Sequence, residues 1–531
     1  MRSSTRSSIA RALCAAIPSA GESSLVAGSA LLTVVAFPDF KLWFLAWISL
    51  APLLVVVART QSALRAFVAG WLWGVIFFYG TCWWLTYPMI HFAGISAWLA
   101  YPLLLLPVIL VALFPALFAG LLARVIQRFG DFALLLAPLI WVSMELLRYA
   151  VTGQLWNALG YSQAFHPAMI QSAGLGGVHA VSFLILAVNT AIVLAALRRT
   201  LLVPLITVIA VAGILVSSQI MIGRGLPHAV TPGSQSAVIA VQPNVPMELS
   251  GDDAQMKTLL NRHFSLSKPS LDLSEEKPPF YSERRLVIWP ESPMNFSYSR
   301  DPHLREVVGN FAQTNHTSIL LNSLEPVQDG GDQNSAILVN EKGEMSARYD
   351  KIRLMPFGEY VPLPRGLPGA SSVRSIVGEF KPGSSYTLMP LGALRAGVFI
   401  CIEAAHPGVA RSFATEGADV LINISNDGYL GPTPVMRQHL SNAVFRAVEN
   451  DRPLIRVTNA GITAFIAPNG AVSDATNGFQ EAVRTWTIAR ESSGSTFYSR
   501  HGDVFVYGCA LISLGFISAS FMRRRVSEAR P

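Results

Sequence analysis

The stretch GVFICIEAAHP, residues 397–407, contains one of only four cysteines in a chain of 531 residues. An apolar run ends at Cys401, and Pro407 follows as a residue that favours the first turn of a helix. The pattern predicts a buried strand, a tight turn and then a helix. Backbone N–H groups in such a turn can stabilise a thiolate and an oxyanion. Cys401 is therefore either a nucleophile or a core cysteine at a strand end.

The composition indicates a membrane protein with a large polar part. Hydrophobic residues make up 51% of the chain and charged residues only 14%, whereas a soluble domain usually has about a quarter charged residues. The formal net charge is +7, but the arginines lie between apolar runs and at the chain ends. This distribution fits membrane orientation better than a nucleic-acid-binding face.

Eight apolar runs predict a polytopic helical membrane region of about eight spans. All but the first approach the ~20 residues that cross a bilayer. The runs divide the chain into a membrane domain with about seven transmembrane helices (1–224), an α/β domain (225–503), and a final transmembrane helix with a basic tail (504–531). The runs lie at roughly 24–37, 41–58, 66–86, 96–123, 131–149, 172–197, 200–222 and 504–522.

The basic residues predict the orientation. Every second loop is basic, which places both termini in the cytoplasm by the positive-inside rule. The polar segment before the last span must then face outward. Lys41 and Arg148 lie on the opposite side, so the bias is not absolute. The basic positions are Arg2, Arg6, Arg11, Arg59, Arg65, Arg124, Arg128, Arg198, Arg199, Arg523, Arg524 and Arg525.

The outward segment reads as a layered α/β domain. A Gly/Pro/Ser-rich linker, GRGLPHAVTPGSQS (223–236), precedes short β-branched runs such as RLVIW and DVLINI. Polar amphipathic stretches of helical length lie between several of these runs, and strands that alternate with helices are typical of layered α/β domains.

Two further segments supply chemistry that a thiol needs. RRLVIWPESP (284–293) places Glu291 just after an apolar strand, and YDKIRLMPFGEYVP (349–362) contains Lys351 and Glu359. A thiol requires a base and a charge stabiliser to act as a nucleophile. Cys14, Cys82 and Cys509 lie before or within predicted spans, where they are expected to be small apolar residues.

Together these segments resemble the nitrilase, or carbon–nitrogen hydrolase, superfamily. The resemblance covers roughly 236–490 and implies an α-β-β-α sandwich with a Glu–Lys–Cys triad. With its membrane spans, the full chain resembles the apolipoprotein N-acyltransferases, the membrane family of that superfamily. The matching motifs are LWNALGYSQ (155–163), WPES, PFGEYVP, ISNDGYLG (424–431) and RPLIRVTNAGITA (452–464).

The resemblance implies the transfer of an acyl chain from a glycerophospholipid to the α-amino group of a diacylglyceryl-cysteine on an apolipoprotein. Cys401 would carry the acyl group as a thioester, and Glu291 would act as the base. Lys351 and the backbone N–H of Ile402 would stabilise the oxyanion. Glu359 would orient Lys351 or the incoming amine.

Glu403 is either a second support beside the nucleophile or a capping or salt-bridged carboxylate. His406 and His439 are expected to be a helix start and a mid-helix residue rather than parts of a Cys–His pair. No zinc-type spacing or nucleotide-binding motif occurs, so no metal and no cofactor are expected.

The resemblance also implies a multi-pass protein of the cell inner membrane with a periplasmic catalytic domain. Membrane lipid, the phospholipid donor and the apolipoprotein acceptor are the expected partners, nucleic acid is not, and the chain is expected to be a monomer. The loop 361–378 is a candidate mobile lid. The chain departs from the family pattern at Ile402, Ser250-Gly251 and Gly428-Tyr429.

Two alternatives remain open at this point. A membrane-tethered amidase would use the same triad with water as the acceptor. A transporter with an external domain would place functional charges inside its helix bundle, and Glu145 and Arg148 are the candidates. Their (i, i+3) spacing also fits a local ion pair.

Overall fold

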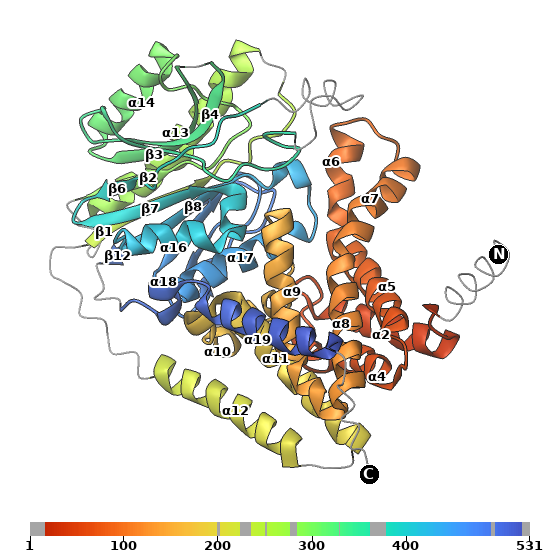
Figure 1. Cartoon of the computed structure of the whole chain (residues 1–531). Helices are drawn as coiled ribbons and strands as arrows, with labels where there is room; N and C mark the ends of the chain where they lie inside the picture. Colours follow the sequence, from red (N-terminus) through yellow and green to blue (C-terminus); the bar gives the residue numbers. More distant parts are fainter. Residues whose placement is uncertain are drawn as a thin grey trace, which may run out of the picture. The chain divides into compact units, whose positions relative to one another are not determined.

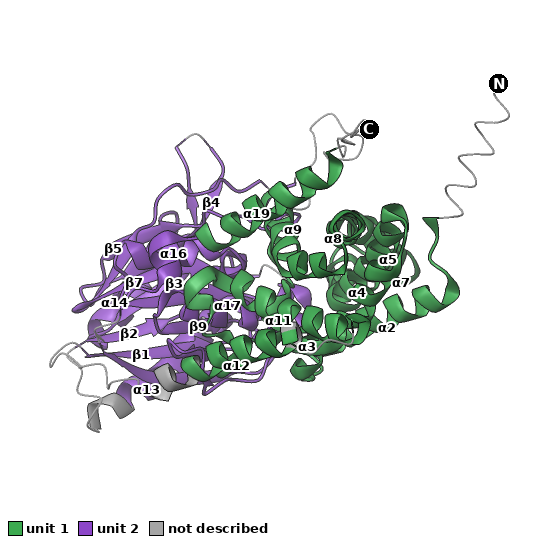
Figure 2. Cartoon of the chain, turned by 60° about the horizontal axis from the view of Figure 1, so that its bottom comes forward, with its two compact units in different colours: residues 1–163, 168–220, 503–531 green, residues 164–167, 221–502 purple. Residues whose placement is uncertain are grey.

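The computed structural model describes residues 16–198, 202–223, 235–249, 252–276, 284–328, 330–361, 379–489 and 494–522. The chain forms two compact units (Figure 2): residues 1–163, 168–220 and 503–531 form unit 1, and residues 164–167 and 221–502 form unit 2. Cys14, Ser250-Gly251, most of the candidate lid and the basic residues at both ends lie outside the described residues.

Unit 1 is helical, as its apolar runs predict (Figure 1). The α-helices of this part of the chain are α2 (Ala20–Ala36), α3 (Ala46–Ser49), α4 (Ala51–Arg59), α5 (Ala63–Cys82), α6 (Thr86–His91), α7 (Ala97–Val111), α8 (Leu113–Phe129), α9 (Ala137–Thr152), α10 (Pro167–Ile170), α11 (Ala173–Arg198), α12 (Leu202–Gly223) and α19 (Val504–Phe521).

The expected count of eight spans is not confirmed. Five described helical segments are long and apolar enough to cross a membrane: Ala63–His91, Ala97–Phe129, Asp131–Thr152, Ala173–Arg198 and Val504–Phe521. Within the described residues, three further apolar helical stretches have 10–17 residues: Ala20–Ala36, Trp43–Arg59 and Leu205–Ser217, the last of which is part of the 22-residue helix α12.

The second apolar run is broken for a physical reason. Its helix is interrupted at Leu50, and the buried side chain of Asn189 accepts hydrogen bonds from the backbone N–H groups of Leu50 (2.9 Å) and Ala51 (3.0 Å). Asn189 thus satisfies donors that the break leaves without a helical partner. The hydrophobic pattern alone does not reveal such a break.

Glycines allow α5 and α8 to approach closely. A Cβ atom on Gly74 would lie 2.6 Å from Cγ of Pro115 and 2.9 Å from Cα of Ala112. Within a membrane the hydrophobic effect does not drive helices together. Small residues at the contacts favour association there because they let the helix backbones approach closely. Outside these contacts, unit 1 exposes many large apolar side chains, including Trp98 and Leu110.

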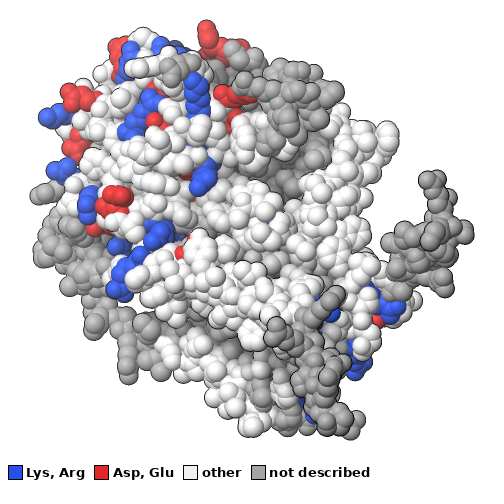
Figure 3. All heavy atoms as spheres, in the orientation of Figure 1, with Lys and Arg blue, Asp and Glu red and all other residues white. Residues whose placement is uncertain are grey.

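Charged side chains are distributed unevenly on the face drawn in Figure 3. They gather over the elements of unit 2, whereas the surface over α6 and α7 is almost free of them. An exposed apolar surface of this kind suits contact with lipid.

Unit 2 contains two six-stranded sheets. The first has the order β12-β1-β2-β3-β4-β5, and the second has the order β11-β10-β9-β8-β7-β6. The strands are β1 (Gln235–Gln242), β2 (Arg285–Ile288), β3 (Ser318–Pro326), β4 (Asp332–Val339), β5 (Met345–Asp350), β6 (Leu388–Leu391), β7 (Leu394–Ile400), β8 (Val420–Ser425), β9 (Leu454–Thr458), β10 (Ala464–Ile466), β11 (Val472–Ser473) and β12 (Ala482–Ala489).

Helices cover the outer face of each sheet, which confirms the expected α-β-β-α sandwich (Figure 1). Helices α13 (Asp253–Glu276) and α14 (Pro302–Thr314) pack on the first sheet, and α16 (Pro407–Thr415) and α17 (Val435–Asn450) pack on the second. A short helix, α18 (Phe497–His501), follows. Apolar side chains of the first sheet, among them Ile239, Val287 and Ile319, form one core cluster with α14.

The strand directions determine where the functional residues emerge. Strands β1, β2 and β3 are parallel, as are β7, β8 and β9. Strand β5 pairs antiparallel to β4, which pairs antiparallel to β3, so β5 runs in the same direction as β2. Residues that follow β2 and β5 therefore leave the same edge of the first sheet, where α/β domains commonly bind ligands.

The contact between α5 and α8 gives a test of unit 1. We expect Gly74→Ala to cost about 1–3 kcal/mol of stability, because rigid backbone and ring atoms of α8 must move to admit the methyl group. A lower apparent Tm of the purified protein in detergent would show this. Gly28→Ala is the matched control, since no atom lies within 4 Å of a Cβ placed there. Equal Tm values for both variants would contradict close packing at Gly74.

Candidate active site

Cys401 lies in a strained turn between β7 and the 3-10 helix η5 (Cys401–Ala405). Its φ angle is +53°, a left-handed conformation that residues other than glycine rarely adopt. Helix α16 begins at Pro407, directly after His406, so the expected strand, turn and helix are all present. The turn places the thiol at the end of a buried strand.

The side chain of Glu403 ties this turn to the segment that contains Lys351. One carboxylate oxygen accepts a hydrogen bond from the N–H of Ile400 (2.8 Å). The other accepts from the N–H groups of Ile352 (2.8 Å) and Arg353 (3.0 Å) and from the Tyr349 hydroxyl (2.8 Å). Of the roles left open by the sequence, the geometry is that of a capping carboxylate.

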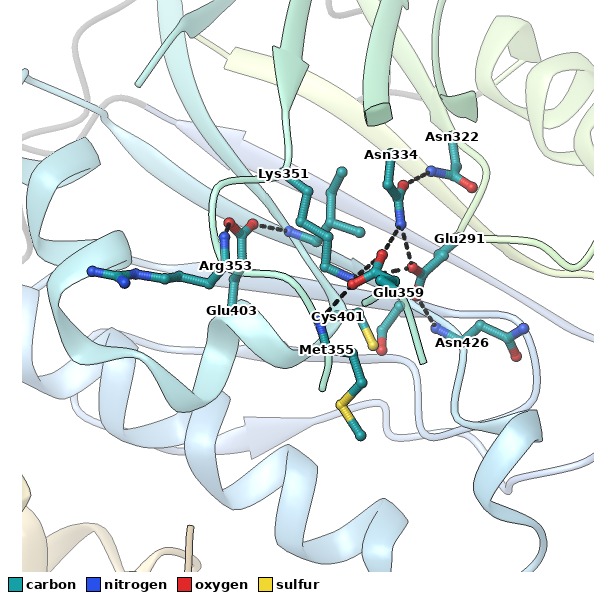
Figure 4. Close-up of polar contacts among 12 residues, drawn as sticks. Glu291, Asn322, Asn334, Lys351, Arg353, Met355, Glu359, Cys401, Glu403 and Asn426 are labelled. Carbon is teal, nitrogen blue, oxygen red and sulfur yellow. Dashed lines mark hydrogen bonds and ion pairs between the residues drawn. The ribbon is translucent and has the colours of Figure 1, made fainter. Parts of the chain in front are cut away.

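Lys351 follows β5 and lies between two carboxylates (Figure 4). Its Nζ is 2.9 Å from Oε1 of Glu359 and 3.5 Å from Oε1 of Glu291, and the residue is 1% exposed. Burial alone would lower the pKa of Lys351, but the charges of Glu359 and Glu291 outweigh burial and raise this pKa above its usual value. These two contacts therefore favour the charged ammonium form of Lys351.

Three asparagines that we did not identify as site residues complete the arrangement. Nδ2 of Asn334 donates to Oε1 of Glu291 (2.9 Å) and to Oε1 of Glu359 (2.7 Å), and Asn322 donates to Oδ1 of Asn334 (2.7 Å). The backbone N–H of Asn426 donates to the other oxygen of Glu291 (3.1 Å). Asn322 and Asn334 are buried polar residues within strands, and that pattern is the signal that could have revealed them.

The surroundings of Cys401 favour its neutral thiol over the thiolate. Burial raises the pKa of Cys401, and the Glu291 carboxylate raises it further, whereas Lys351 lowers it by less. A preformed thiolate–ammonium pair is thus disfavoured. The arrangement can perform nucleophilic catalysis if Glu291 removes the proton as the thiol attacks, while Lys351 stabilises negative charge on the substrate oxygen.

The two histidines near the nucleophile do not form a Cys–His pair. His406 precedes α16 and is buried, and burial lowers its pKa to about 3. His439 lies within α17, and its Nε2 is 3.0 Å from the backbone carbonyl oxygen of Cys401. That contact is to the backbone and not to the sulfur. Among the described residues, no group of three or more His, Cys, Asp or Glu side chains could hold a metal ion.

Glu145 and Arg148 bind the backbone of a neighbouring loop of unit 1. Glu145 accepts from the N–H of Leu159 (2.8 Å) and also contacts His179 (3.2 Å). Arg148 donates to the carbonyl oxygen of Trp156 (2.7 Å). Both charged side chains thus hold the LWNALGYSQ segment in place, and this gives them a structural role that does not require transport.

Two family models of known proteins match this chain, one mainly within unit 1 and one within unit 2. Residues 29–191 match the family model described as the apolipoprotein N-acyltransferase N-terminal domain, and residues 276–498 match the carbon–nitrogen hydrolase model. The apolipoprotein N-acyltransferase of Geobacter metallireducens is 31% identical over 94% of this chain and 95% of its own. That of Azotobacter vinelandii is 32% identical over 95% and 96%. The solved structure of Saccharomyces cerevisiae Nit3, a nitrilase-superfamily member, covers 52% of this chain and 97% of its own, with 17% identity and a TM-score of 0.37.

The fold and the site define a membrane protein with a carbon–nitrogen hydrolase domain. Similarity over nearly the full length then identifies the family: this chain belongs to the apolipoprotein N-acyltransferases. It is an N-acyltransferase of lipoprotein maturation, with lipid and lipoprotein substrates. The family membership favours acyl transfer over the amidase and transporter alternatives.

The role of Lys351 can be tested without leaving two buried carboxylates uncompensated. The double variant Lys351→Met/Glu359→Gln removes one positive and one negative charge together, so the net charge of the cluster is kept. We expect this variant to stay folded and to lose acyl transfer by about 10²-fold or more, which is the effect of losing one oxyanion donor. Single-turnover kinetics would measure it.

The exposed Lys342, on the turn between β4 and β5, provides the control. Lys342→Met should transfer the acyl chain at the wild-type rate. Near-normal turnover in the folded double variant would instead mean that Lys351 has only a structural role.

Proposed function

We propose that this chain moves a fatty acyl chain from a membrane glycerophospholipid, through a thioester on Cys401, to the α-amino group of the N-terminal diacylglyceryl-cysteine of apolipoproteins. This would be the last step of lipoprotein maturation. The observation that carries the proposal is the position of the Lys351 ammonium between Glu291 and Glu359, beside a thiol in a strained strand-to-helix turn (Figure 4).

In the first half of the reaction, Glu291 takes the proton from the sulfur of Cys401, and the sulfur attacks the ester carbonyl carbon of the phospholipid. Lys351 and the backbone N–H of Ile402 stabilise the oxyanion that forms. When the tetrahedral intermediate collapses, the C–O bond breaks, and the proton on Glu291 goes to the departing lysophospholipid oxygen. Cys401 then carries the acyl chain as a thioester.

In the second half, Glu291 takes a proton from the α-amino group of the apolipoprotein as its nitrogen attacks the thioester carbon. The C–S bond breaks, and the proton returns to the sulfur of Cys401. Amines attack thioesters more readily than oxygen esters, so two moderate barriers replace one high barrier. The 2.9 Å contact with Lys351 supports a role for Glu359 in orienting that lysine.

The finer location is part of the same proposal. The membrane domain would be 1–224 and the catalytic domain 225–503, with a last transmembrane helix and basic tail at 504–531. The alternating basic loops support an inner-membrane protein with both termini in the cytoplasm and a periplasmic catalytic domain. The enzyme would act as a monomer on phospholipid and diacylglyceryl apolipoprotein.

The thioester is directly testable. Enzyme incubated with phospholipid alone should gain one fatty-acyl mass on the peptide that contains Cys401, because transfer in two steps requires the intermediate before the acceptor arrives. Neutral hydroxylamine should remove the adduct. Mass spectrometry of the digested enzyme measures both outcomes.

Acceptor and active-site variants control this experiment. A diacylglyceryl peptide with a free N-terminal amine should discharge the adduct, and the same peptide acetylated at that amine should not. Cys401→Ala should form no adduct, and Glu291→Gln should form it far more slowly, because the thiol is then left protonated. Normal acyl transfer by Cys401→Ala would refute the mechanism.

The orientation has its own test. Single cysteines at the exposed positions Gln61 and Glu306, in a background with the native cysteines replaced, should differ in labelling by a membrane-impermeant maleimide. In intact spheroplasts, Glu306→Cys should react and Gln61→Cys should react only after lysis. The reverse pattern would overturn the periplasmic assignment.

A further inference from the structure

The backbone carbonyl of the nucleophile is held by a side chain that the mechanism above does not use. His439 comes from α17, 38 residues after Cys401, and is 2% exposed. Its Nε2 lies 3.0 Å from the carbonyl oxygen of Cys401. A carbonyl oxygen only accepts hydrogen bonds, so Nε2 carries a proton and donates it.

The imidazole ring of His439 is also held through its second nitrogen, Nδ1. Nδ1 of His439 is 2.8 Å from Oδ1 of Asp427. A carboxylate also only accepts, so both contacts are hydrogen bonds when the ring is the doubly protonated cation, whose formation burial and Arg456 oppose by lowering the pKa of His439 and Asp427 favours by raising it. Arg456 is fully buried and donates to both carboxylate oxygens of Asp427, at 2.9 and 3.1 Å. The ring therefore has little freedom to rotate away from Cys401.

A second contact holds the same carbonyl more weakly. Nδ2 of Asn423 is 3.5 Å from the carbonyl oxygen of Cys401 and 3.2 Å from that of Phe399, and Arg456 donates to the amide oxygen of Asn423. Arg456 thus anchors Asn423 directly and His439 through Asp427. Two of its side chains, His439 and Asn423, contact the carbonyl of the peptide bond after Cys401.

This restraint has a consequence for catalysis because a trans peptide bond is planar. The carbonyl of Cys401 and the N–H of Ile402 belong to the same peptide plane and point in opposite directions. A carbonyl held against His439 directs the Ile402 N–H away from α17. The φ angle of +53° at Cys401 is unfavourable for an L-residue, so contacts such as that with His439 help to hold the turn.

We propose that His439 is a positioning residue for acyl transfer. It holds the Cys401–Ile402 peptide so that the N–H of Ile402 faces the oxyanion, and Asp427 and Arg456 hold its ring. The inference rests on the proposed roles of Cys401 as acyl carrier and of Ile402 as oxyanion donor. His439 does not act as the base for the thiol, since its Nε2 proton is directed at the carbonyl.

Two amide substitutions separate the two contacts of His439. In His439→Gln, the side-chain amide can replace Nε2 and donate to the Cys401 carbonyl, but the contact with Asp427 is lost. In His439→Asn, the shorter amide can replace Nδ1 and contact Asp427, but it does not reach the carbonyl. Both variants replace the ring with a neutral amide side chain.

Two reactions of the same sulfur provide the readout. Acylation by p-nitrophenyl butyrate passes through a tetrahedral oxyanion and releases a burst of p-nitrophenol equal to the enzyme present. Alkylation by iodoacetamide is a displacement that forms no oxyanion, and mass spectrometry follows it on the peptide that contains Cys401. A residue that positions the oxyanion donor should affect the first reaction and not the second.

We expect His439→Asn to lower the acylation rate by about tenfold or more, which is part of the effect of losing an oxyanion donor. Its alkylation rate should stay within about twofold of the wild-type rate, and His439→Gln should keep most of the acylation rate. Glu291→Gln, which removes the base, should slow both reactions.

Three results would overturn the inference. These are equal acylation rates for His439→Asn and His439→Gln, parallel losses of acylation and alkylation in His439→Asn, and no ester burst from the wild-type enzyme. The test is independent of the natural donor. A wild-type burst with the nitrophenyl ester but no adduct from phospholipid would refute the proposed function and leave the role of His439 to be decided by the variants.

Discussion

The buried ammonium of Lys351 is the constraint on which the site depends. A cation that is 1% exposed must be paired with opposite charge, and Glu291 and Glu359 supply it from two different segments. Glu291 follows β2, and Lys351 follows β5, at the same edge of one sheet. Glu291 and Lys351 therefore meet only when β2 and β5 take their places in the first sheet.

Cys401, the proposed nucleophile, follows a strand of the other sheet, so the two sheets must be held in a fixed position relative to each other at this edge. Glu403 makes that connection, because its carboxylate accepts from the backbone on both sides, at Ile400 and at Ile352 and Arg353. Asn334 similarly holds Glu291 and Glu359 with one amide nitrogen. Catalytic groups need such support because displacements of about 1 Å are costly.

Unit 1 is stabilised by different kinds of contact from those in unit 2. Its helices approach through glycine, as at Gly74, and it leaves large apolar side chains exposed, which is unfavourable in water and suitable in lipid. Several backbone N–H groups within it are paired with buried side chains: Asn189 binds two of them, and Glu145 binds another. The substrates of this family are lipids and lipoproteins, so a membrane part and a hydrolase-like part in one chain are consistent with a reaction on lipid-bound groups.

The amino-acid sequence by itself determined the features that depend on local pattern. Hydrophobic runs predicted the helices of unit 1, and alternating strands and helices, with the family motifs, predicted the sandwich of unit 2. The ends of the apolar runs located Glu291 and Cys401, although their chemical roles stay predictions. Asp427 was visible within a motif but had no assigned partner.

The tertiary structure decided what depends on residues far apart in the chain. The backbone N–H at the Leu50 interruption is bound by Asn189, 139 residues away. The predicted count of eight spans was not confirmed. Strands and helices from separate segments must also meet to form three further contacts. These are the capping contacts of Glu403, the bridging contacts of Asn334 and the contact of His439 with Cys401. Hydrophobic periodicity predicts which face of a helix or strand is buried. It does not predict which distant polar group contacts that face, because strand order and helix packing determine that contact.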